Sequence, residues 1–353
     1  MTNQSHTDIR ISVLIPMRNE KAYVRGCLDS VIGQIADRSD VEILAIDGAS
    51  TDGTDEIVRA YAARDERIQL VENPQGIVPT GMNLALARAR GRYVIRLDCH
   101  ATYAPDYLDA CVAVLERTGA DNVGGYIETL PGSESDVGRA IAVATSHRFG
   151  VGGSAFRIGG QEAEVDTVPF GAFRRSVFDT VGLYDERLAR NQDIELNARI
   201  RAHGGRIIIS PKIRLQYYNR GTFAGLCDQA FHNGLWNPYT VWLVGGGLSI
   251  RHFVPMLFVM SLLACGGAAF AFPLAGWAFM GIVSLYVVSA ASMAMSAALK
   301  KRCPRLAPLV FAAFVLLHLA YGIGSLCGVI TAPIRFGRPG RRKPFGTPTK
   351  DGC

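Results

Sequence analysis

No charged side chain occurs between Phe253 and Leu299, and this stretch constrains the fold more than any other feature of the chain. At roughly 20 residues per crossing it is long enough for two transmembrane helices. Pro273 marks the break between them, so we predict helices over about 253–272 and 274–298, and a third apolar helix over about 307–330. The alternative is a buried core hairpin, which rarely stays free of charge over such a length.

The charge distribution supports a membrane partner. Arg251 to Lys350 contains no Asp or Glu, and its bases form two clusters beside the apolar runs: Lys300, Lys301, Arg302 and Arg305, then Arg335, Arg338, Arg341, Arg342 and Lys343. Bases next to apolar spans indicate anionic lipid headgroups rather than nucleic acid. Two crossings would return the first cluster to the side of residues 1–250, but a third would export the second cluster. The third segment therefore either spans against the positive-inside rule or is re-entrant.

The beginning of the chain and its cysteines predict that the first part of the chain lies in the cytosol. Met1 to Arg10 is polar and shows no signal peptide or N-terminal anchor. The eight cysteines are scattered without a C-x-x-C pair, which is typical of free thiols in a reducing compartment. We expect a multi-pass protein of the cytoplasmic (inner) membrane with its first 250 residues in the cytosol.

Strand-like and helix-like segments alternate through the first part of the chain. Short apolar runs occur at Ile11–Ile15, Glu42–Ile46, Ile68–Val71 and Tyr93–Leu97, with helix-length sequence between them. This order predicts an α/β domain with a mostly parallel, Rossmann-like sheet over residues 1–240, followed by a membrane domain of α-helices over 241–353.

Polar residues collect directly after three of these strands. They are Pro16 to Glu20, Asp47 to Thr54 and Asp98 to His100. Ligands of open parallel sheets bind outside the carboxyl ends of the strands, so we expect these segments to line one pocket.

The rest of the first domain gives weaker signals. Gly132 to Glu164 is rich in Gly, Ser and Ala, and we expect a mobile connection there with a helix near Gly138 to His147. A helix over Asn191 to His203 and a strand over Arg206 to Ser210 follow.

Several motifs, in order, resemble the inverting family 2 glycosyltransferases, whose GT-A fold binds nucleotide-diphosphosugars. They are Pro16-Met17-Arg18-Asn19-Glu20, Asp47-Gly48-Ala49-Ser50-Thr51-Asp52-Gly53-Thr54, Gly81-Met82-Asn83-Leu84-Ala85, Phe170-Gly171-Ala172-Phe173-Arg174-Arg175, Gly182-Leu183-Tyr184-Asp185-Glu186 and Gln192-Asp193. The resemblance covers residues 11 to about 240. With the C-terminal membrane segments, it is closest to the bacterial exopolysaccharide branch of succinoglycan-type glucosyltransferases.

The resemblance implies a donor subsite at the first two strand ends. Asp47 would hydrogen-bond the base or ribose, while Pro16, Asn19 and Glu20 shape the same subsite. The alternative for Asp47 is a turn acid that caps the helix after Gly53.

Asp98 and His100 lie two residues apart after a strand, so both side chains can face one divalent ion. Asp98 would also contact the donor. One carboxylate and one imidazole suit Mn²⁺ somewhat better than Mg²⁺. The alternative is a histidine packed against Tyr103.

Inversion at the anomeric carbon needs a base, and we predict Asp193. Its carboxylate is favoured by the helix N-terminus and it matches the second residue of the family's E-D pair, in which Gln192 replaces Glu. Glu195 lies on another face of the helix and is better suited as a surface residue or an arginine partner. The alternative for Asp193 is a simple N-cap.

Four further residues are candidates for the acceptor or the diphosphate: Gly171, Arg220, Gln229 and Trp236. The segment from Gln229 to Trp236 resembles the Q-x-x-R-W helix of processive relatives but lacks its arginine, which favours single transfer. Trp236 is equally well explained as an aromatic residue at the membrane interface.

The sequence thus predicts transfer of a hexose from a nucleotide sugar, a UDP-sugar by resemblance, to a polyprenyl-diphosphate-linked saccharide in cell-surface or exopolysaccharide synthesis. The main alternative is a non-catalytic membrane scaffold that binds a nucleotide or lipid. A nucleotidyltransferase would need a basic Gly-rich loop, whereas Gly48 to Gly53 is acidic. An oxidoreductase of Rossmann type is disfavoured because no G-x-G-x-x-G follows the first strand.

Overall fold

The computed structural model describes residues 8–339, which divide into two compact units. The first contains residues 8–128 and 159–217, and the second contains residues 129–158 and 218–339. The boundary near residue 240 that the sequence suggests falls inside a helix, α10 (Phe223–Val244). The functional division at that point stays a prediction.

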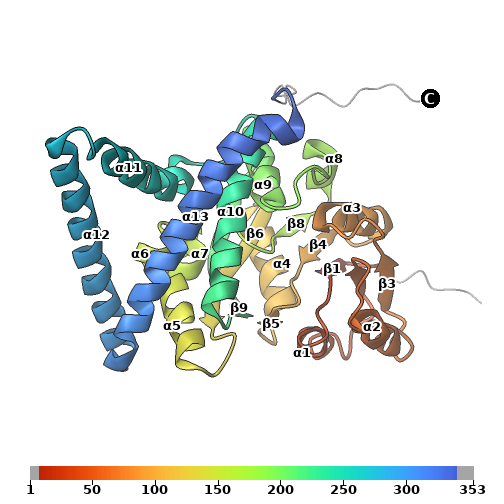
Figure 1. The fold of residues 1–353 in the computed structure, drawn as a ribbon. Coiled ribbons are helices and arrows are strands. Elements are labelled where there is room, and N and C mark those ends of the chain that lie inside the picture. Colours follow the sequence, from red (N-terminus) through yellow and green to blue (C-terminus); the bar gives the residue numbers. More distant parts are fainter. Residues whose placement is uncertain (1–7, 340–353) are drawn as a thin grey trace, which may run out of the picture. The chain divides into compact units, whose positions relative to one another are not determined.

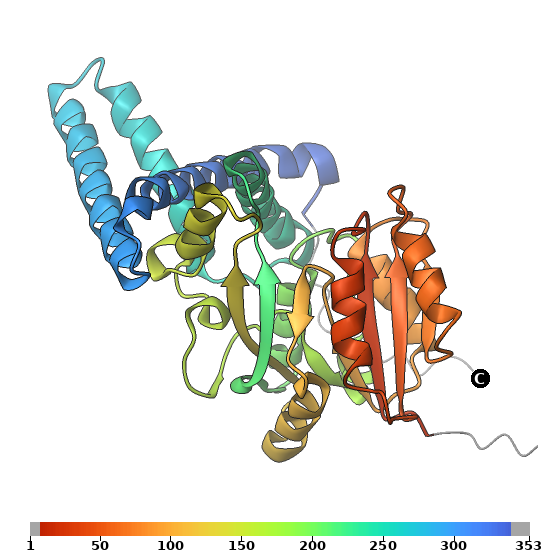
Figure 2. The ribbon, with the colours of Figure 1, turned by 90° about the horizontal axis from the view of Figure 1, so that it is seen from below.

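The first unit begins with a parallel sheet. Its strands lie in the order β3 (Ile68–Glu72), β2 (Val41–Asp47), β1 (Ile11–Met17) and β4 (Tyr93–Arg96), and each neighbouring pair is parallel. Helices α1 (Val24–Ile32) and α2 (Thr54–Ala62) cover one face, and α3 (Val78–Arg88) covers the other (Figures 1 and 2). Because both faces are covered, β1 and β2 are buried along nearly their whole length rather than at alternate residues.

The sheet continues beyond β4 with strands that the sequence does not reveal as a group. β8 (Ala172–Arg174) pairs antiparallel with β4 and with β6 (Asn122–Leu130). Next in order come β9 (Ile207–Tyr218) and β5 (Ala101–Tyr103), while β7 (Ala163–Glu164) also pairs with β9. The predicted α/β fold is confirmed, and its far half is antiparallel. Helices α4 (Tyr107–Thr118), α8 (Ser176–Val181) and α9 (Gln192–Ala202) complete the unit.

The second unit is helical. It contains α5 (Asp136–Thr145), α6 (Arg148–Val151), α7 (Ala155–Ile158), α10, α11 (Val254–Ala268), α12 (Pro273–Lys300) and α13 (Ala307–Phe336), with short 3₁₀ turns at Ile250–Phe253 and Pro304–Leu306. Three of its helical segments are long and apolar enough to cross a membrane, namely Ile250–Ala268, Pro273–Lys300 and Pro304–Phe336. The predicted break at Pro273 is where α12 begins, and the third helix is longer than predicted.

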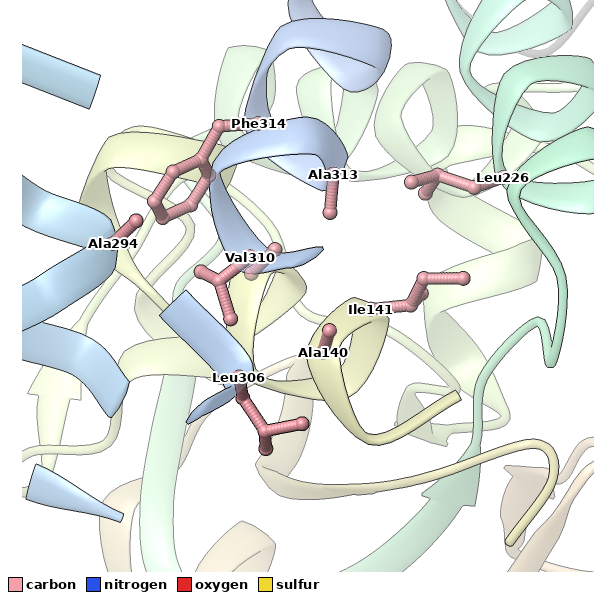
Figure 3. Close-up of a cluster of buried hydrophobic side chains, with 9 residues drawn as sticks. Ala140, Ile141, Leu226, Ala294, Leu306, Val310, Ala313 and Phe314 are labelled. Atoms are coloured by element: carbon pink, nitrogen blue, oxygen red, sulfur yellow. The ribbon is translucent and has the colours of Figure 1, made fainter. Parts of the chain in front are cut away.

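A hydrophobic cluster joins four of these helices. Residues of α5, α10, α12 and α13, with Leu306 just before α13, pack together as Ala140, Ile141, Ala144, Leu226, Ala294, Leu306, Val310, Ala313 and Phe314 (Figure 3). This cluster anchors the start of α13 on α5. The glycine-rich part of α13 is regular helix, and its glycines admit the backbone of α10: a Cβ on Gly324 would lie 2.1 Å from the carbonyl oxygen of Phe231.

The cysteines within residues 8–339 are all free, and Cys27, Cys99 and Cys111 are buried. Cys353 lies outside the described residues.

Candidate active site

The carboxyl ends of the parallel strands meet at one edge of the sheet. Met17, the last residue of β1, is the register partner of Asp47, the last residue of β2. Asp47 in turn is the partner of Glu72 at the end of β3. The polar segments that follow β1 and β2 therefore start side by side, and hydrogen bonds join them directly.

Asn19 connects the two loops. Its side-chain oxygen accepts a hydrogen bond of 2.8 Å from the backbone N–H of Thr51, and its own N–H donates to Ser50 Oγ at 2.9 Å. Asn19 adopts a left-handed backbone (φ 57°), which asparagine tolerates better than most residues. At the next residue, the N–H of Glu20 donates to Thr54 Oγ1 at 2.8 Å. Asn19 thus holds the loop; any contact with a donor stays a prediction.

Asp47 presents an unpaired carboxylate oxygen. Its Oδ2 accepts a hydrogen bond of 3.1 Å from the N–H of Ser50, whereas Oδ1 is buried and has no hydrogen-bond partner among the described residues. Asp47 does not cap α2, because Asp52 accepts the N–H of Thr54 there. A buried acceptor without a donor is costly, and a ligand that brings an N–H or O–H group would satisfy it.

Asp98, His100 and Glu20 gather at the end of β4. His100 Nδ1 lies 3.2 Å from Glu20 Oε2 and 3.8 Å from Asp98 Oδ1. The N–H of His100 donates to the same Asp98 oxygen at 2.9 Å, which fixes the turn between them. Glu20 Oε2 is buried, and apart from this contact with His100 it has no partner among residues 8–339. Two carboxylates and an imidazole therefore face one another.

The ring of His100 packs against Tyr23 rather than Tyr103. The centroids of the His100 and Tyr23 rings are 4.4 Å apart, and Tyr217 follows at 6.3 Å. The hydroxyl of Tyr103 instead accepts the N–H of Asp98 at 2.6 Å. Tyr103 therefore holds the backbone of Asp98 in place through this hydrogen bond. Over residues 8–339, no group of three or more His, Cys, Asp or Glu side chains is arranged to hold a metal.

Asp193 lies in the first turn of α9, as predicted, and is partly exposed. Glu195 points elsewhere: it is buried and forms a two-pronged ion pair with Arg199, at 2.7 and 2.8 Å. Its predicted role as an arginine partner is confirmed, although the pair is not on the surface. Gln192 is buried beside them, so Asp193 is the carboxylate of this turn that a substrate can reach.

Arg96 and Tyr184 are candidate site residues that the motif analysis did not single out. Arg96 is 6% exposed, and its Nε and Nη1 have no hydrogen-bond partner among the described residues. Its guanidinium lies near enough to Tyr184 to act on the charge of the hydroxyl, and Tyr184 also lies within electrostatic reach of Asp193. Burial, with Asp193 adding to it and Arg96 opposing it, raises the pKa of Tyr184 to about 12. The sequence signal that could have identified Arg96 is its charge in an otherwise apolar strand, β4.

Asn83 explains why two of the motifs occur together. Its side chain accepts the N–H of Tyr184 at 3.0 Å and donates to the carbonyl of Tyr184 at 2.9 Å. The side-chain amide of Asn83 thus pairs with the backbone of Tyr184 as a neighbouring β-strand would, and this pairing positions the Tyr184 ring. Gly81, two residues earlier, is needed because a Cβ there would lie 2.7 Å from Ile46 on β2. The motif from Gly81 to Ala85 is structural in this chain.

The four weaker candidates fall into both units. Gly171 belongs to the first, where a Cβ would lie 2.3 Å from Asn122 Oδ1 and its carbonyl accepts the N–H of Arg96 at 3.0 Å. Arg220, Gln229 and Trp236 belong to the second. Trp236 is buried and packs against Tyr239, with ring centroids 5.4 Å apart, which supports a packing role. Their contact with an acceptor stays a prediction.

Comparison with known proteins establishes the family. The model described as "Glycosyl transferase family 2" matches residues 12–182, and one relative is 31% identical over 92% of this chain. The chain belongs to the family 2 glycosyltransferases and is an enzyme of that class. That relative is the succinoglycan biosynthesis protein ExoA of Rhizobium meliloti, of which 96% is covered.

Two other matches are consistent with this assignment. The dolichyl N-acetyl-alpha-D-glucosaminyl phosphate 3-beta-D-2,3-diacetamido-2,3-dideoxy-beta-D-glucuronosyltransferase of Methanococcus voltae is 26% identical over 64% of this chain and 71% of its own length. The mannosyltransferase PcManGT from Pyrobaculum calidifontis, solved in complex with GDP-Man and Mn²⁺, superposes with a TM-score of 0.56 at 20% identity over 90% of this chain and 87% of that one. The chain is thus related to exopolysaccharide and lipid-linked saccharide transferases, and the last match shows a shared fold.

Proposed function

We propose that this glycosyltransferase moves a hexose, with inversion, from a nucleotide sugar to a lipid-linked saccharide in cell-surface or exopolysaccharide synthesis. The main support is the buried Asp47 Oδ1, an acceptor without a hydrogen-bond partner among the described residues, at the edge where the parallel strands end. A nucleoside offers N–H and O–H donors for such an oxygen. UDP is the expected nucleotide from family resemblance. Family membership favours this reading over a non-catalytic scaffold.

A divalent cation fits the residues after β4. Two ligands that each lie about 2.1 Å from one ion can be at most about 4.2 Å apart, and Asp98 Oδ1 and His100 Nδ1 are 3.8 Å apart. The protein would supply these two ligands and the donor diphosphate the others, a common arrangement for Mg²⁺ and Mn²⁺. When bound, the ion would neutralise the charge that develops on the leaving diphosphate. The imidazole favours Mn²⁺.

Asp193 is the proposed base. The acceptor hydroxyl attacks the anomeric carbon from the face opposite the diphosphate, and its proton passes to the Asp193 carboxylate. A new carbon–oxygen bond forms, and the electron pair of the broken bond leaves with the nucleoside diphosphate. Tyr184 lies within electrostatic reach of this carboxylate and of Arg96.

The helical unit supports a lipid-linked acceptor. A polyprenyl diphosphate cannot diffuse through water, so a catalytic unit tethered at the cytosolic leaflet of the cytoplasmic membrane gains effective concentration of acceptor. Arg220, Gln229 and Gly171 are proposed to contact the acceptor or the diphosphate. The absence of the Q-x-x-R-W arginine supports single transfer. We propose a multi-pass protein with its active site in the cytosol.

The test is donor hydrolysis and lipid transfer by detergent-purified protein with a panel of nucleotide sugars, with Mn²⁺, Mg²⁺ or EDTA. Asp193→Asn should slow transfer by about 10²–10⁴-fold while leaving donor binding intact. Asp98→Asn should weaken both donor binding and the response to metal. Asp179→Asn, an exposed acid on α8, is the matched control and should change neither. If no donor is consumed and Asp193→Asn behaves like the control, the proposal is wrong.

A further inference from the structure

The third apolar helix, α13, is long enough to cross a bilayer, yet it is flanked along its length by segments that carry exposed charges. Its first turns pack on α5 through the cluster of Figure 3. Arg305, just before α13, lies 3.5 Å from Asp136 at the start of α5. Midway along, His318 Nε2 bonds the backbone oxygen of Phe149 in α6 at 2.8 Å.

The second half of α13 packs on α10 from end to end. Gly324 admits the carbonyl of Phe231, and Gly328 admits that of Leu235. Further on, Thr331 and the hydroxyl of Tyr239 are hydrogen-bonded at 2.6 Å. Finally, Trp242 Nε1 donates to the carbonyl of Gly337, directly after α13 ends. The two helices therefore run in the same direction as a pair.

The flanking helices cannot follow α13 into hydrocarbon. On α5, Asp136 and Arg139 have side chains that are 43% and 49% exposed. On α10, Asp228 and His232 are 69% and 41% exposed and lie 3.2 Å apart. A charged side chain at the bilayer centre costs about 2.5–3.5 kcal/mol or more, and a helix is only about 10–12 Å across, so these groups would lie at the same depth as α13.

The hairpin of α11 and α12 has the opposite character. It contains no charge between Phe253 and Leu299, and its large apolar side chains are exposed, among them Leu263, Trp277 and Leu285. In both views of the fold it projects away from α13 (Figures 1 and 2). Only the last turns of α12 are buried, at Ala290, Ala294, Ala297 and Ala298, which is the end that joins the cluster on α5.

We infer that the α11–α12 hairpin alone crosses the membrane and that α13 lies along the interface, on the same side as α5 and α10. The exposed apolar residues of α13, which include Val329, Ile330 and Ile334, would enter the headgroup region. The first basic cluster then faces the same leaflet as Arg335 and Arg338, which resolves the conflict with the positive-inside rule. Anionic headgroups are the chemical partner of that surface. The inference concerns topology and does not depend on the reaction.

The full-length protein in a Gram-negative host tests this with paired reporters. Green fluorescent protein, which fluoresces only when it is folded in the cytosol, and alkaline phosphatase, which is active only outside it, are each fused after Cys353 or inserted at Ala271 in the hairpin tip. We expect fluorescence without phosphatase activity at the C-terminus and phosphatase activity at Ala271. An active phosphatase after Cys353 means that α13 spans, and it overturns the inference.

A second measurement avoids fusions. Spheroplasts of cells that make the unmodified protein are treated with a membrane-impermeant maleimide, and labelled peptides are identified by mass spectrometry. The peptide that ends in Cys353 should stay unlabelled until the cells are permeabilised. Labelling of Cys353 in sealed spheroplasts would place the tail outside and contradict the inference, whatever the reporters show.

Discussion

Gly324→Ala should destabilise the contact between α10 and α13, and the size of the effect follows from the geometry. A Cβ at position 324 would lie 2.1 Å from the carbonyl oxygen of Phe231, whereas ordinary contact begins at 3.4 Å. The obstacle is backbone, so no rotamer can relieve it and the helices must separate by about 1 Å. A gap of that size loses a quarter to a half of the local dispersion energy, and overpacking typically costs about 1–3 kcal/mol.

We expect a net cost of about 1–2 kcal/mol for Gly324→Ala, because alanine favours the helix itself by up to about 1 kcal/mol. At about 2–4 °C per kcal/mol, Tm should fall by about 2–8 °C. Two of the three tryptophans, Trp236 and Trp242, lie on α10, so intrinsic fluorescence in detergent reports the affected pair during thermal unfolding.

The matched control is Gly281→Ala on α12. A Cβ at that position meets nothing within 4 Å, and the same gain in helix propensity applies. Gly281→Ala should melt at or slightly above the wild-type temperature. If Gly324→Ala melts with the wild type, or if both variants lose the same amount, α10 and α13 are not packed as described.

Three further predictions concern the first unit. Arg96→Met should slow transfer by about tenfold or more, the equivalent of one charged hydrogen bond. Tyr184→Phe should slow transfer less, because the guanidinium of Arg96 remains. Single-turnover kinetics measure both rates. Glu42→Ala should lower the free energy of unfolding by about 2 kcal/mol, because buried Glu42 accepts three hydrogen bonds; equal thermal stability would contradict this. Hydrogen bonds from Arg67 hold the pKa of Asp65 below its ordinary value of 3.8. That stabilisation is complete above the ordinary value and lost as the pH falls through the folded one, so Asp65→Asn should flatten the acid limb of stability measured against pH.

The part of the site that the sequence predicts best depends on local chain order. Asp47 and Asp98 end apolar runs of a parallel sheet, and parallel strands bring their carboxyl ends to one edge whatever the rest of the chain does. Helical periodicity alone predicted that Glu195 lies on another face of the helix than Asp193 and is better suited as an arginine partner. The ion pair between Glu195 and Arg199 confirms this prediction.

Other features depended on tertiary contacts that no local pattern encodes. β5, β7 and β8 have only three, two and three residues, too few for a periodic signal, so the antiparallel half of the sheet was not predicted. Arg96 and Tyr184 lie far apart in the chain, and their meeting depends on how Asn83 holds the backbone of Tyr184. The third apolar helix was predicted to end near residue 330, whereas α13 continues through Pro333 to Phe336. Gly324 and Gly328 within it are contact points for α10.

The hydrogen bonds of Asn19 bear on how tightly a donor can bind. Loops that order only when a ligand arrives reduce affinity by the entropy lost at that moment. Asn19 already joins its loop to Ser50 and Thr51, so the donor side of the site is preorganised before any nucleotide enters. Differences in affinity between nucleotide sugars should then reflect direct contacts with Asp47 and its neighbours, and calorimetric titration of a donor should show little conformational penalty.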